Sequence, residues 1–531
     1  MRITQTALGI LLVVILMPAH AALGATGFSF ADVMREARWF SQHPYKPPPQ
    51  VPRFLANISY GQYQAIRFNP AKSLWSGAGR NFQVQPVPPG LYYTSLVSLM
   101  VVKNGAVHPL HFPKSDFAYP STALSARLPD NPGVAGFKLT YPLSGPGIRN
   151  QFLVFAGASY FRAVGRGNNF GLSARAIAIN TAFPPDEEFP AFRKFWLVEP
   201  QRGACSILVY ALLDGPSVSG AYRFLITPGN ATRMEVRAVL FFRKTPRVTG
   251  IAPLTSMFFY GDGTPRPSGE WRPAVHDSDG LQIENGDGEW LWRPLINPAH
   301  FLVSSFTLDN PRGFGLMQRE ERFSAYEDLG ARYDLRPSAW IVPDGKWGRG
   351  QLELVEIPAE SETEDNIVAY WVPAAPPVPG REYRYAYTLL FGRAGVSRPP
   401  AAYVEDSFVG SGHDPGAACN SQENSLRFVV DFGGKFPQSA SRAEGVVSAG
   451  GNAQVNQVSV ARNTVSGGYR LAFLVKPEPG HPLELRAFLR HGQNTLSETW
   501  SYLLPWDNAR ALFATPACPA SRAAPGMPIS R

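Results

Sequence analysis

The chain has 531 residues, which is long for a single domain, so we expect two domains. Hydrophobic residues make up 44% of the sequence, an ordinary fraction for a globular protein. The formal net charge is +9, but the lysines and arginines are scattered and form no basic run, so we expect no nucleic-acid partner.

The N-terminus has the features of a cleavable export signal. Met1-Arg2 gives a positive start, the stretch Ala7–Met17 is apolar, and Ala19-His20-Ala21 fits the small-x-small cleavage rule. We therefore expect a signal peptide over residues 1–21 and a mature chain that starts near Ala22. The apolar stretch is short for a membrane span, and no later segment is long and apolar enough to cross a bilayer, so the mature chain should have no transmembrane segment.

The clearest helical signal follows the signal peptide. Ser29 and Asp32 have the spacing of a capping box. Apolar residues then recur at helical spacing and should face the core. They are Phe30, Val33, Met34 and Ala37. A proline run at residues 47–49 lies beyond the helix.

From about Leu91 to Ala252 the pattern is one of strands and turns. Residues 233–238 alternate polar and apolar side chains, as a half-buried strand does. Asp214-Gly215 and Pro228-Gly229 read as turns between apolar runs. Many strands at this spacing indicate an antiparallel sandwich rather than a parallel sheet with crossover helices.

The C-terminal part reads as a second, smaller β domain. Residues 383–391 alternate like one more strand of the first domain, so we place the boundary near Arg398-Pro399-Pro400 and assign residues 22–398 to the first domain. Residues 403–518 carry several strand-like runs and have the size of an immunoglobulin-like sandwich. Residues 519–531 are small and polar, and we expect a disordered tail.

The three cysteines cannot all pair within the chain. Cys419 and Cys518 lie near the two ends of the second domain and could close one loop. Cys205 opens an apolar run, so we expect a buried free thiol there. No Cys/His cluster has metal-ligand spacing and no glycine-rich dinucleotide fingerprint is present, so we expect neither a metal site nor a cofactor.

Residues 271–372 are dense in carboxylates, arginines and indoles that adjoin apolar runs. A cleft that binds and cuts sugar needs these residue types, because aromatic faces stack on pyranose rings and two carboxyls act as acid and base. Taken from the residues alone, Asp277 also fits a turn, since Asp277-Ser278-Asp279-Gly280 is good turn chemistry. Asp365 also fits a capping residue ahead of a buried strand.

Several long and unusual strings carry a resemblance to a known family. They are residues 157–162, 171–175, 252–258, 288–295, 332–340 and 365–371. With them the chain resembles, from about Phe28 to Leu504, the periplasmic glucan biosynthesis proteins of the G and D type. Those proteins take part in making osmoregulated periplasmic glucans in Gram-negative bacteria.

The resemblance implies an all-β fold, with a large mutarotase-like antiparallel β-sandwich followed by a small immunoglobulin-like β-sandwich. It implies a periplasmic protein, β-1,2-glucan as substrate, and inner-membrane glucan synthesis machinery as a candidate partner. Members of the family are known as inverting endo-β-1,2-glucanases, which implies Asp365 as general acid and Asp277 as general base. Tyr333, Arg336 and Glu362 match family positions that line the cleft.

Two tryptophans, Trp290 and Trp371, are our candidates for stacking on the sugar. Aromatic residues in a sandwich are more often core than platform, so we expect at least half of Trp290, Trp292, Trp340 and Trp371 to be buried. Three functions stay open at this point. They are a glycoside hydrolase that trims the glucan, a non-catalytic glucan carrier or scaffold, and a transglycosylase or branching factor.

Overall fold

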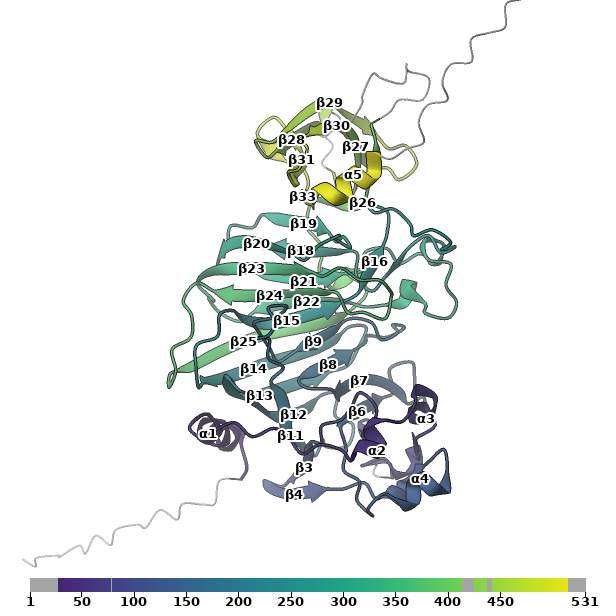
Figure 1. Cartoon of the computed structure of the whole chain (residues 1–531), viewed down its shortest axis with the longest axis vertical. Coiled ribbons are helices and arrows are strands. Elements are labelled where there is room, and N and C mark those ends of the chain that lie inside the picture. Colours follow the sequence, from purple (N-terminus) through teal and green to yellow (C-terminus); the bar gives the residue numbers. More distant parts are fainter. Residues whose placement is uncertain (1–26, 78, 413–424, 437–441, 514–531) are drawn as a thin grey trace, which may run out of the picture.

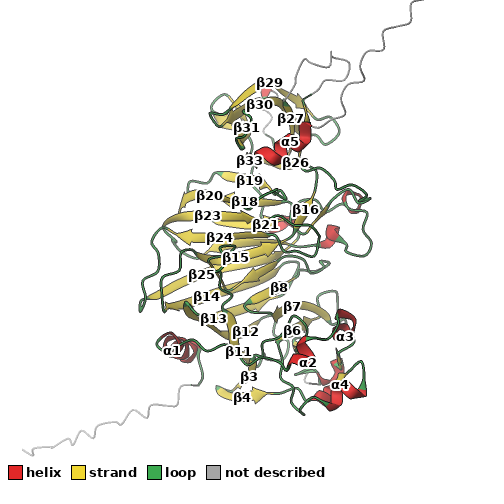
Figure 2. Ribbon diagram, in the orientation of Figure 1, coloured by secondary structure: helices red, strands yellow, loops and turns green. Residues whose placement is uncertain are grey.

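The computed structural model describes residues 27–77, 79–412, 425–436 and 442–513. Strands predominate and the helices are short (Figure 2), so the predicted all-β class is confirmed. Two large sheets form the body of the molecule, and a small sheet lies at the C-terminal end (Figure 1). Among these residues, no helix is long and apolar enough to cross a membrane.

The first large sheet has ten strands within the described residues, all paired antiparallel. Its spatial order is β2 (Gln83–Val87), β6 (Gly136–Tyr141), β7 (Asn150–Ala156), β8 (Tyr160–Ala163), β9 (Ser173–Arg175), β15 (Thr249–Ser256), β24 (Ile367–Pro373), β23 (Arg349–Glu356) and β20 (Leu302–Asp309), with β10 (Ile177–Ile179) also paired to β15.

The second large sheet has fifteen strands within the same residues. Its spatial order is β28 (Glu444–Ala449), β31 (Leu483–His491), β33 (Thr499–Leu504), β19 (Trp290–Pro294), β18 (Gly280–Glu284), β21 (Gly313–Met317), β22 (Ser338–Pro343), β25 (Glu382–Gly392), β14 (Thr232–Phe242), β13 (Val218–Thr227), β12 (Ile207–Asp214), β11 (Ala191–Val198), β3 (Ser98–Lys103) and β4 (Ala106–Leu110), with β32 (Asn494–Thr495) paired to β31. Two of these pairings, β3 with β11 and β19 with β33, are parallel.

Smaller elements complete the described chain. The C-terminal sheet has the order β26 (Ala402–Ser411), β27 (Leu426–Gly434), β30 (Tyr469–Pro477) and β29 (Ala453–Arg462). Two short pairs are β1 (Arg67–Phe68) with β5 (Phe117–Ala118), and β16 (Phe258–Tyr260) with β17 (Val275–His276). The helices are α1 (Phe30–Ser41), α2 (Arg53–Ala56), α3 (Tyr60–Gln64), α4 (Thr122–Ala126) and α5 (Trp506–Phe513), with 3-10 turns η1 (Pro70–Lys72), η2 (Lys114–Asp116), η3 (Phe323–Ala325), η4 (Tyr333–Leu335) and η5 (Ala394–Val396).

The predicted helix, the two predicted turns and the alternating strand of the first domain are confirmed. Ser29 and Asp32 form the capping box of α1, and Val33 and Ala37 have no exposed surface. These two residues pack against the outer face of β12 to β14. The predicted turns separate β12 from β13 and β13 from β14, and the alternating segment 233–238 lies within β14.

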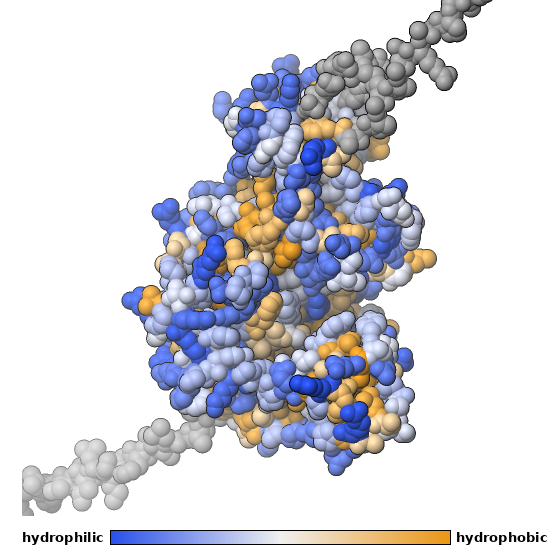
Figure 3. Space-filling model, in the orientation of Figure 1, coloured by the Kyte–Doolittle hydropathy of each residue, from blue (hydrophilic) through white to orange (hydrophobic). Residues whose placement is uncertain are grey.

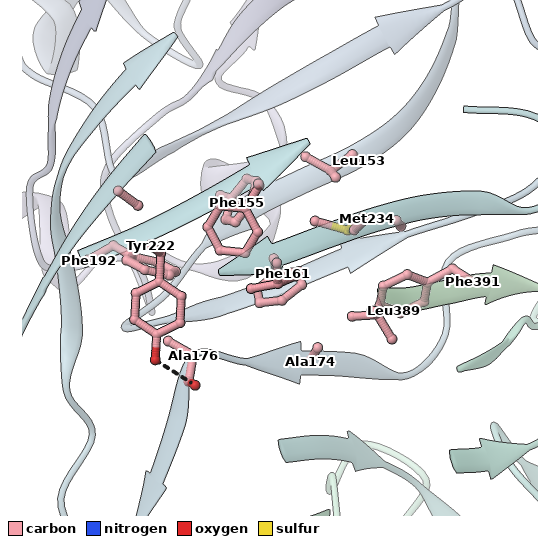
Figure 4. Packing of buried hydrophobic residues seen from close by; sticks show 14 of the residues in the cluster. Leu153, Phe155, Phe161, Ala174, Ala176, Phe192, Tyr222, Met234, Leu389 and Phe391 are labelled. Atoms are coloured by element: carbon pink, nitrogen blue, oxygen red, sulfur yellow. Dashed lines mark hydrogen bonds between the residues drawn. The ribbon is translucent and has the colours of Figure 1, made fainter. Parts of the chain in front are cut away.

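The main core lies between the two large sheets. Phe155 of the first sheet meets Phe192 of the second with ring centroids 6.0 Å apart (Figure 4). Tyr222, also in the second sheet, donates its hydroxyl proton across the core to the carbonyl oxygen of Ala176 at 2.9 Å (Figure 4). Burial of this aromatic layer on both sides is what joins the sheets into a sandwich.

The second core joins the C-terminal strands to the rest of the molecule. Trp292 of β19 and Trp340 of β22 belong to the same buried cluster as Phe428 of β27 and Trp500 of β33. The second large sheet also continues from β19 into β33. The chain leaves the last strand of the large sandwich at Gly392 and begins β26 at Ala402, so we keep the boundary near residue 398 as a proposal.

The prediction of a buried thiol at Cys205 is wrong. Its side chain is exposed, because β12 and its buried face begin only at Ile207 and Cys205 lies in the preceding turn. The signal peptide (1–21), the tail (519–531), and the pairing of Cys419 with Cys518 lie outside the described residues.

The buried position of Trp371 gives a stability prediction. Trp371 on β24 has no exposed surface and belongs to the main core, so Trp371→Ala leaves a large cavity there. We expect the free energy of unfolding in urea to fall by about 3–5 kcal/mol. Val465→Ala is the control, because Val465 is 97% exposed and its truncation should change the free energy by less than about 0.5 kcal/mol. Equal effects of the two variants would contradict this core.

Candidate functional site

Asp365 is held at the start of β24 by its neighbour Asn366. The side-chain amide of Asn366 donates to the carbonyl oxygen of Phe258 at 3.0 Å, and its oxygen accepts from the backbone N–H of Phe258 at 2.9 Å. Asn366 is 2% exposed, so this reciprocal pair is shielded from water. It fixes the backbone beside Asp365 against the first residue of β16.

Asp277 is held against the same segment from the other side. His276 pairs with Phe258 in the two-stranded ladder of β16 and β17. The backbone N–H of Asp277 donates to the carbonyl oxygen of Met257 at 2.8 Å. The two carboxylates come from loops far apart in the sequence. The segment of Asp277 is hydrogen-bonded to Met257 and paired with Phe258, and Asn366, next to Asp365, is hydrogen-bonded to Phe258. The structure therefore brings the two predicted catalytic residues into one site.

Asp277 is a buried carboxyl with a shifted pKa. Its side chain is 12% exposed, and its Oδ1 lies 3.4 Å from Nε of Arg336. Burial raises the pKa of Asp277 to about 6, an effect that the positive charge of Arg336 opposes and the negative charge of Asp365 reinforces. At pH 7 the carboxylate is mostly ionised, yet it is a much better proton acceptor than an ordinary aspartate.

Asp365, by contrast, is open to solvent, with 43% of its side chain exposed. Its Oδ2 lies 3.3 Å from a guanidinium nitrogen of Arg162 on β8. Strand order places β8 two strands from β15, the neighbour of β24, so Arg162 reaches Asp365 across the end of the first sheet. Nε of Arg162 donates to the carbonyl oxygen of Gly171 at 3.3 Å, which orients the guanidinium.

The three predicted cleft residues lie in the same cluster. The hydroxyl of Tyr333 donates to Oε2 of Glu362 at 3.0 Å, and the guanidinium of Arg336 lies 5.4 Å from the centroid of the Tyr333 ring. Gly171 makes room for Arg336, because a Cβ there would be 3.0 Å from Cδ of the arginine. A side chain at position 171 would require Arg336 to shift by a few tenths of an ångström.

Two further arginines contribute to the site and were not among the predicted site residues. One is Arg162, the partner of Asp365. The other is Arg272, which contacts Glu362 at 2.5 Å, Asp328 at 3.0 Å and Glu270 at 2.8 Å. Their positions in the sequence could have identified them as site residues. Arg162 lies in one of the family-like strings, residues 157–162, and Arg272 lies in the carboxylate-rich stretch 271–372.

The predicted role of the two tryptophans is not supported. Trp371 has no exposed surface, because its face of β24 points into the core, so the prediction that it contacts substrate is wrong. Trp290 stacks on Trp340 with centroids 5.7 Å apart and packs against the C-terminal core, outside the cluster of Asp277 and Asp365. The expectation that at least half of the four tryptophans are buried is confirmed by Trp292, Trp340 and Trp371.

The site is open to solvent on one side, since 43% of the Asp365 side chain and 38% of the Glu362 side chain are exposed. The surface is notched between the lobe that contains β16 and the lobe that contains β6 and β7, on the side where β8 ends (Figure 3). A separate cavity of about 530 Å³, lined by Thr249, Pro373 and Tyr385 among others, lies at the opposite ends of β15 and β24. That cavity contains none of the five predicted residues of the cluster. An open notch suits a chain-like ligand better than a small molecule.

The arrangement can perform acid–base chemistry on a polar ligand. It has one buried carboxylate with a pKa near neutrality, one exposed carboxylate, and three arginines and a tyrosine around them. In the part of the chain that the structure describes, no group of three or more His, Cys, Asp or Glu side chains is placed to hold a metal ion.

The chain matches proteins of known family over nearly its whole length. Residues 28–504 match the family described as periplasmic glucan biosynthesis protein, MdoG. The chain is 42% identical over 497 residues to glucans biosynthesis protein G of Ralstonia nicotianae, covering 92% of this chain and 98% of that protein. Among solved structures it is similar to a galactose mutarotase related enzyme from Lactobacillus acidophilus, with 9% identity, a TM-score of 0.20, and coverage of 45% of this chain and 97% of that one.

The raised pKa of Asp277 makes stability depend on pH. Unfolded Asp277 should lose its proton near its ordinary value of 3.8, but folded Asp277 loses it only near 6. Ionisation therefore costs the folded state free energy that grows as pH rises through this window and is complete above pH 6. Asp277→Asn removes this cost.

We expect the stability of Asp277→Asn relative to the wild type to rise by about 2 kcal/mol between about pH 4.5 and pH 7.5 in urea unfolding. Asp130→Asn is the control, since that side chain is 98% exposed. A pH-independent difference for Asp277→Asn would show that the carboxyl is not buried as described.

Proposed function

Because the chain belongs to the MdoG family of periplasmic glucan biosynthesis proteins, we propose that its part in glucan biosynthesis is to hydrolyse the β-1,2-glucan backbone. The reaction would be an inverting endo-hydrolysis that trims the polymer. One observation carries the proposal. Two carboxylates with different environments, Asp277 and Asp365, are held by hydrogen bonds of their loops to the adjacent residues Met257 and Phe258, at a site that is open to solvent beside Asp365.

Asp277 acts as the general base. An efficient base has a pKa near the working pH, and burial brings the pKa of Asp277 to about 6. In the proposed reaction the ionised carboxylate takes a proton from a water molecule. That water attacks the anomeric carbon from the face opposite to the leaving oxygen, which inverts its configuration. Arg336 keeps Asp277 ionised between turnovers, because its positive charge lowers the pKa.

Asp365 acts as the general acid and gives its proton to the glycosidic oxygen as the bond to the anomeric carbon breaks. Its exposure places it where a bound chain can reach it. In the free protein Oδ2 of Asp365 is engaged in an ion pair with Arg162, whereas proton transfer needs a carboxyl oxygen of Asp365 on the glycosidic oxygen. The proposed reaction therefore requires that substrate rearranges the contact between Arg162 and Asp365.

The remaining polar residues form a wall that holds hydroxyl groups of the sugar. Glu362 can accept hydrogen bonds from the glucan because Arg272 and Tyr333 already fix its carboxylate. Arg336 and Arg162 offer further N–H donors on either side. Such preorganised groups position the bond to be cut without being consumed in the reaction.

The Arg162–Asp365 ion pair also favours a second candidate function. A glucan carrier needs no protonated carboxyl, and a salt-bridged aspartate is a good acceptor for sugar hydroxyls. In that case the protein would present nascent glucan to inner-membrane synthesis machinery. A transglycosylase would use the same two carboxylates with a sugar hydroxyl in place of water.

The product profile of purified mature protein on linear β-1,2-glucan separates these functions. We expect the wild type to produce short oligosaccharides, and Asp277→Asn and Asp365→Asn to lose on the order of 10²–10⁴-fold in rate while remaining folded. Asp130→Asn should cleave at the wild-type rate, since Asp130 lies on the exposed surface. Intact polymer with retained glucan binding would instead establish the carrier.

The pH dependence of hydrolysis tests the role of Asp277. We expect kcat/KM on β-1,2-glucooligosaccharides to fall on the acid side with a midpoint near pH 6, because protonated Asp277 cannot act as base. Arg336→Gln should move this midpoint to higher pH, since the variant lacks the positive charge that lowers the pKa. An acid limb that stays in place in Arg336→Gln would contradict the assignment of Asp277 as base.

A further inference from the structure

The segment that carries Asp277 is fastened by consecutive residues at the end of β21. Oε1 of Gln318 accepts a hydrogen bond from Nδ1 of His276 at 2.9 Å, and Nε2 of Gln318 donates to the carbonyl oxygen of His276 at 3.1 Å. Oδ2 of Asp279 accepts from the backbone N–H groups of Arg319 at 2.9 Å and Glu320 at 3.0 Å. Asp277 is therefore held on both sides by residues 318–320.

The side chain of Arg319 points the other way, to the C-terminal strands. Its guanidinium donates to both carboxylate oxygens of Glu498, at 2.6 Å and 3.0 Å, and to the carbonyl oxygen of Val404 at 2.7 Å. It also donates to Oε1 of Gln282 at 2.7 Å and lies 3.6 Å from the ring centroid of Trp292. Two adjacent residues thus bind different parts of the molecule: the side chain of Gln318 binds the segment of Asp277, and the side chain of Arg319 binds the C-terminal strands.

The pair of Arg319 and Glu498 is well placed to transmit a fixed geometry. The Glu498 side chain has no exposed surface and that of Arg319 is 9% exposed. Oε1 of Glu498 also accepts from the backbone N–H of Val404 at 2.6 Å, so the carboxylate is tied to β26 as well as to the segment before β33. A bidentate, desolvated pair of this kind has little freedom to rotate or separate.

We propose that Arg319 and Glu498 are positioning residues, through which the C-terminal strands hold Asp277 in the geometry that hydrolysis requires. Neither side chain touches the proposed substrate cleft. Their effect passes through the main chain of Arg319 to Asp279 and from there to Asp277, two residues away. This inference rests on the proposed role of Asp277 as general base.

The test compares Glu498→Gln and Arg319→Lys with a matched control. Glu498→Gln removes the charge and keeps the shape, and Arg319→Lys keeps the charge but cannot form the fork of two bonds. The control is Asp431→Asn, which breaks another bidentate pair, with Arg470 at 2.8 Å and 2.6 Å. That pair joins β27 to β30 and makes no contact with residues 276–279.

We expect kcat to fall by about tenfold to a hundredfold in Glu498→Gln and Arg319→Lys, with KM changed less than about threefold, because the base is misplaced while the sugar contacts remain. Hydrogen exchange should also become faster in a peptide that covers residues 275–283. Asp431→Asn should change neither quantity. Wild-type kcat together with unchanged exchange in both variants would overturn the proposal.

Removing one partner leaves a buried charge, so a single variant can fail to fold. The double variant Arg319→Gln with Glu498→Gln removes both charges, so the test can still be made if a single variant does not fold. Thermal unfolding checks that the double variant is folded. The two measurements also separate this inference from the proposed function. If the wild type does not cleave β-1,2-glucan, the function fails, whereas positioning is still decided by exchange in residues 275–283. If residues 275–283 exchanged as slowly in the folded double variant as in the wild type, the positioning role would be refuted.

Discussion

The hydrogen bonds that two distant loops make to Met257 and Phe258 are the constraint on which the rest of the site depends. Asn366 closes a reciprocal amide pair with Phe258, and Asp277 donates its backbone N–H to Met257. Together with the ion pair of Arg272 with Glu362, these bonds relate the loop that ends in Asp365 to the loop that carries Asp277. The sandwich supplies the rigid base, because β15 leads directly into Met257 and pairs with β24.

Opposing electrostatic effects then give the two carboxylates different properties. Burial disfavours the charged form of Asp277 and raises its pKa, whereas the positive charge of Arg336 lowers it. The resulting pKa of Asp277 is about 6. Asp365 stays in water beside Arg162. Gly171 links the two halves, because its carbonyl oxygen orients Arg162 and its missing side chain makes room for Arg336. The C-terminal strands add a further support through the buried carboxylate of Glu498.

Local sequence patterns predicted the helices and strands that are determined by residues close to one another in the sequence. The capping box and helical spacing predicted α1, and the alternation at residues 233–238 predicted β14. Trp371 was misplaced because β24 is buried on both faces from Ile367 to Trp371, so alternation gives no sign of which side meets the core. The continuation of one sheet from β19 to β33 had no signal either, since a pairing between residues some two hundred positions apart leaves no local pattern.

The same distinction applies to the site. The resemblance to the family indicated Asp277, Asp365, Tyr333, Arg336 and Glu362, and these five side chains do lie in one cluster. Their shared anchor could not be predicted, because its hydrogen bonds join residues 108 positions apart and depend on strand register.

The anomeric configuration of the first product, followed by proton NMR during cleavage of linear β-1,2-glucan, is the most direct test of the proposed roles of the two carboxylates. An inverting reaction on a β-linked backbone must first release the α-anomer. Initial release of the β-anomer, or no cleavage at all, would contradict the proposed roles of Asp277 and Asp365.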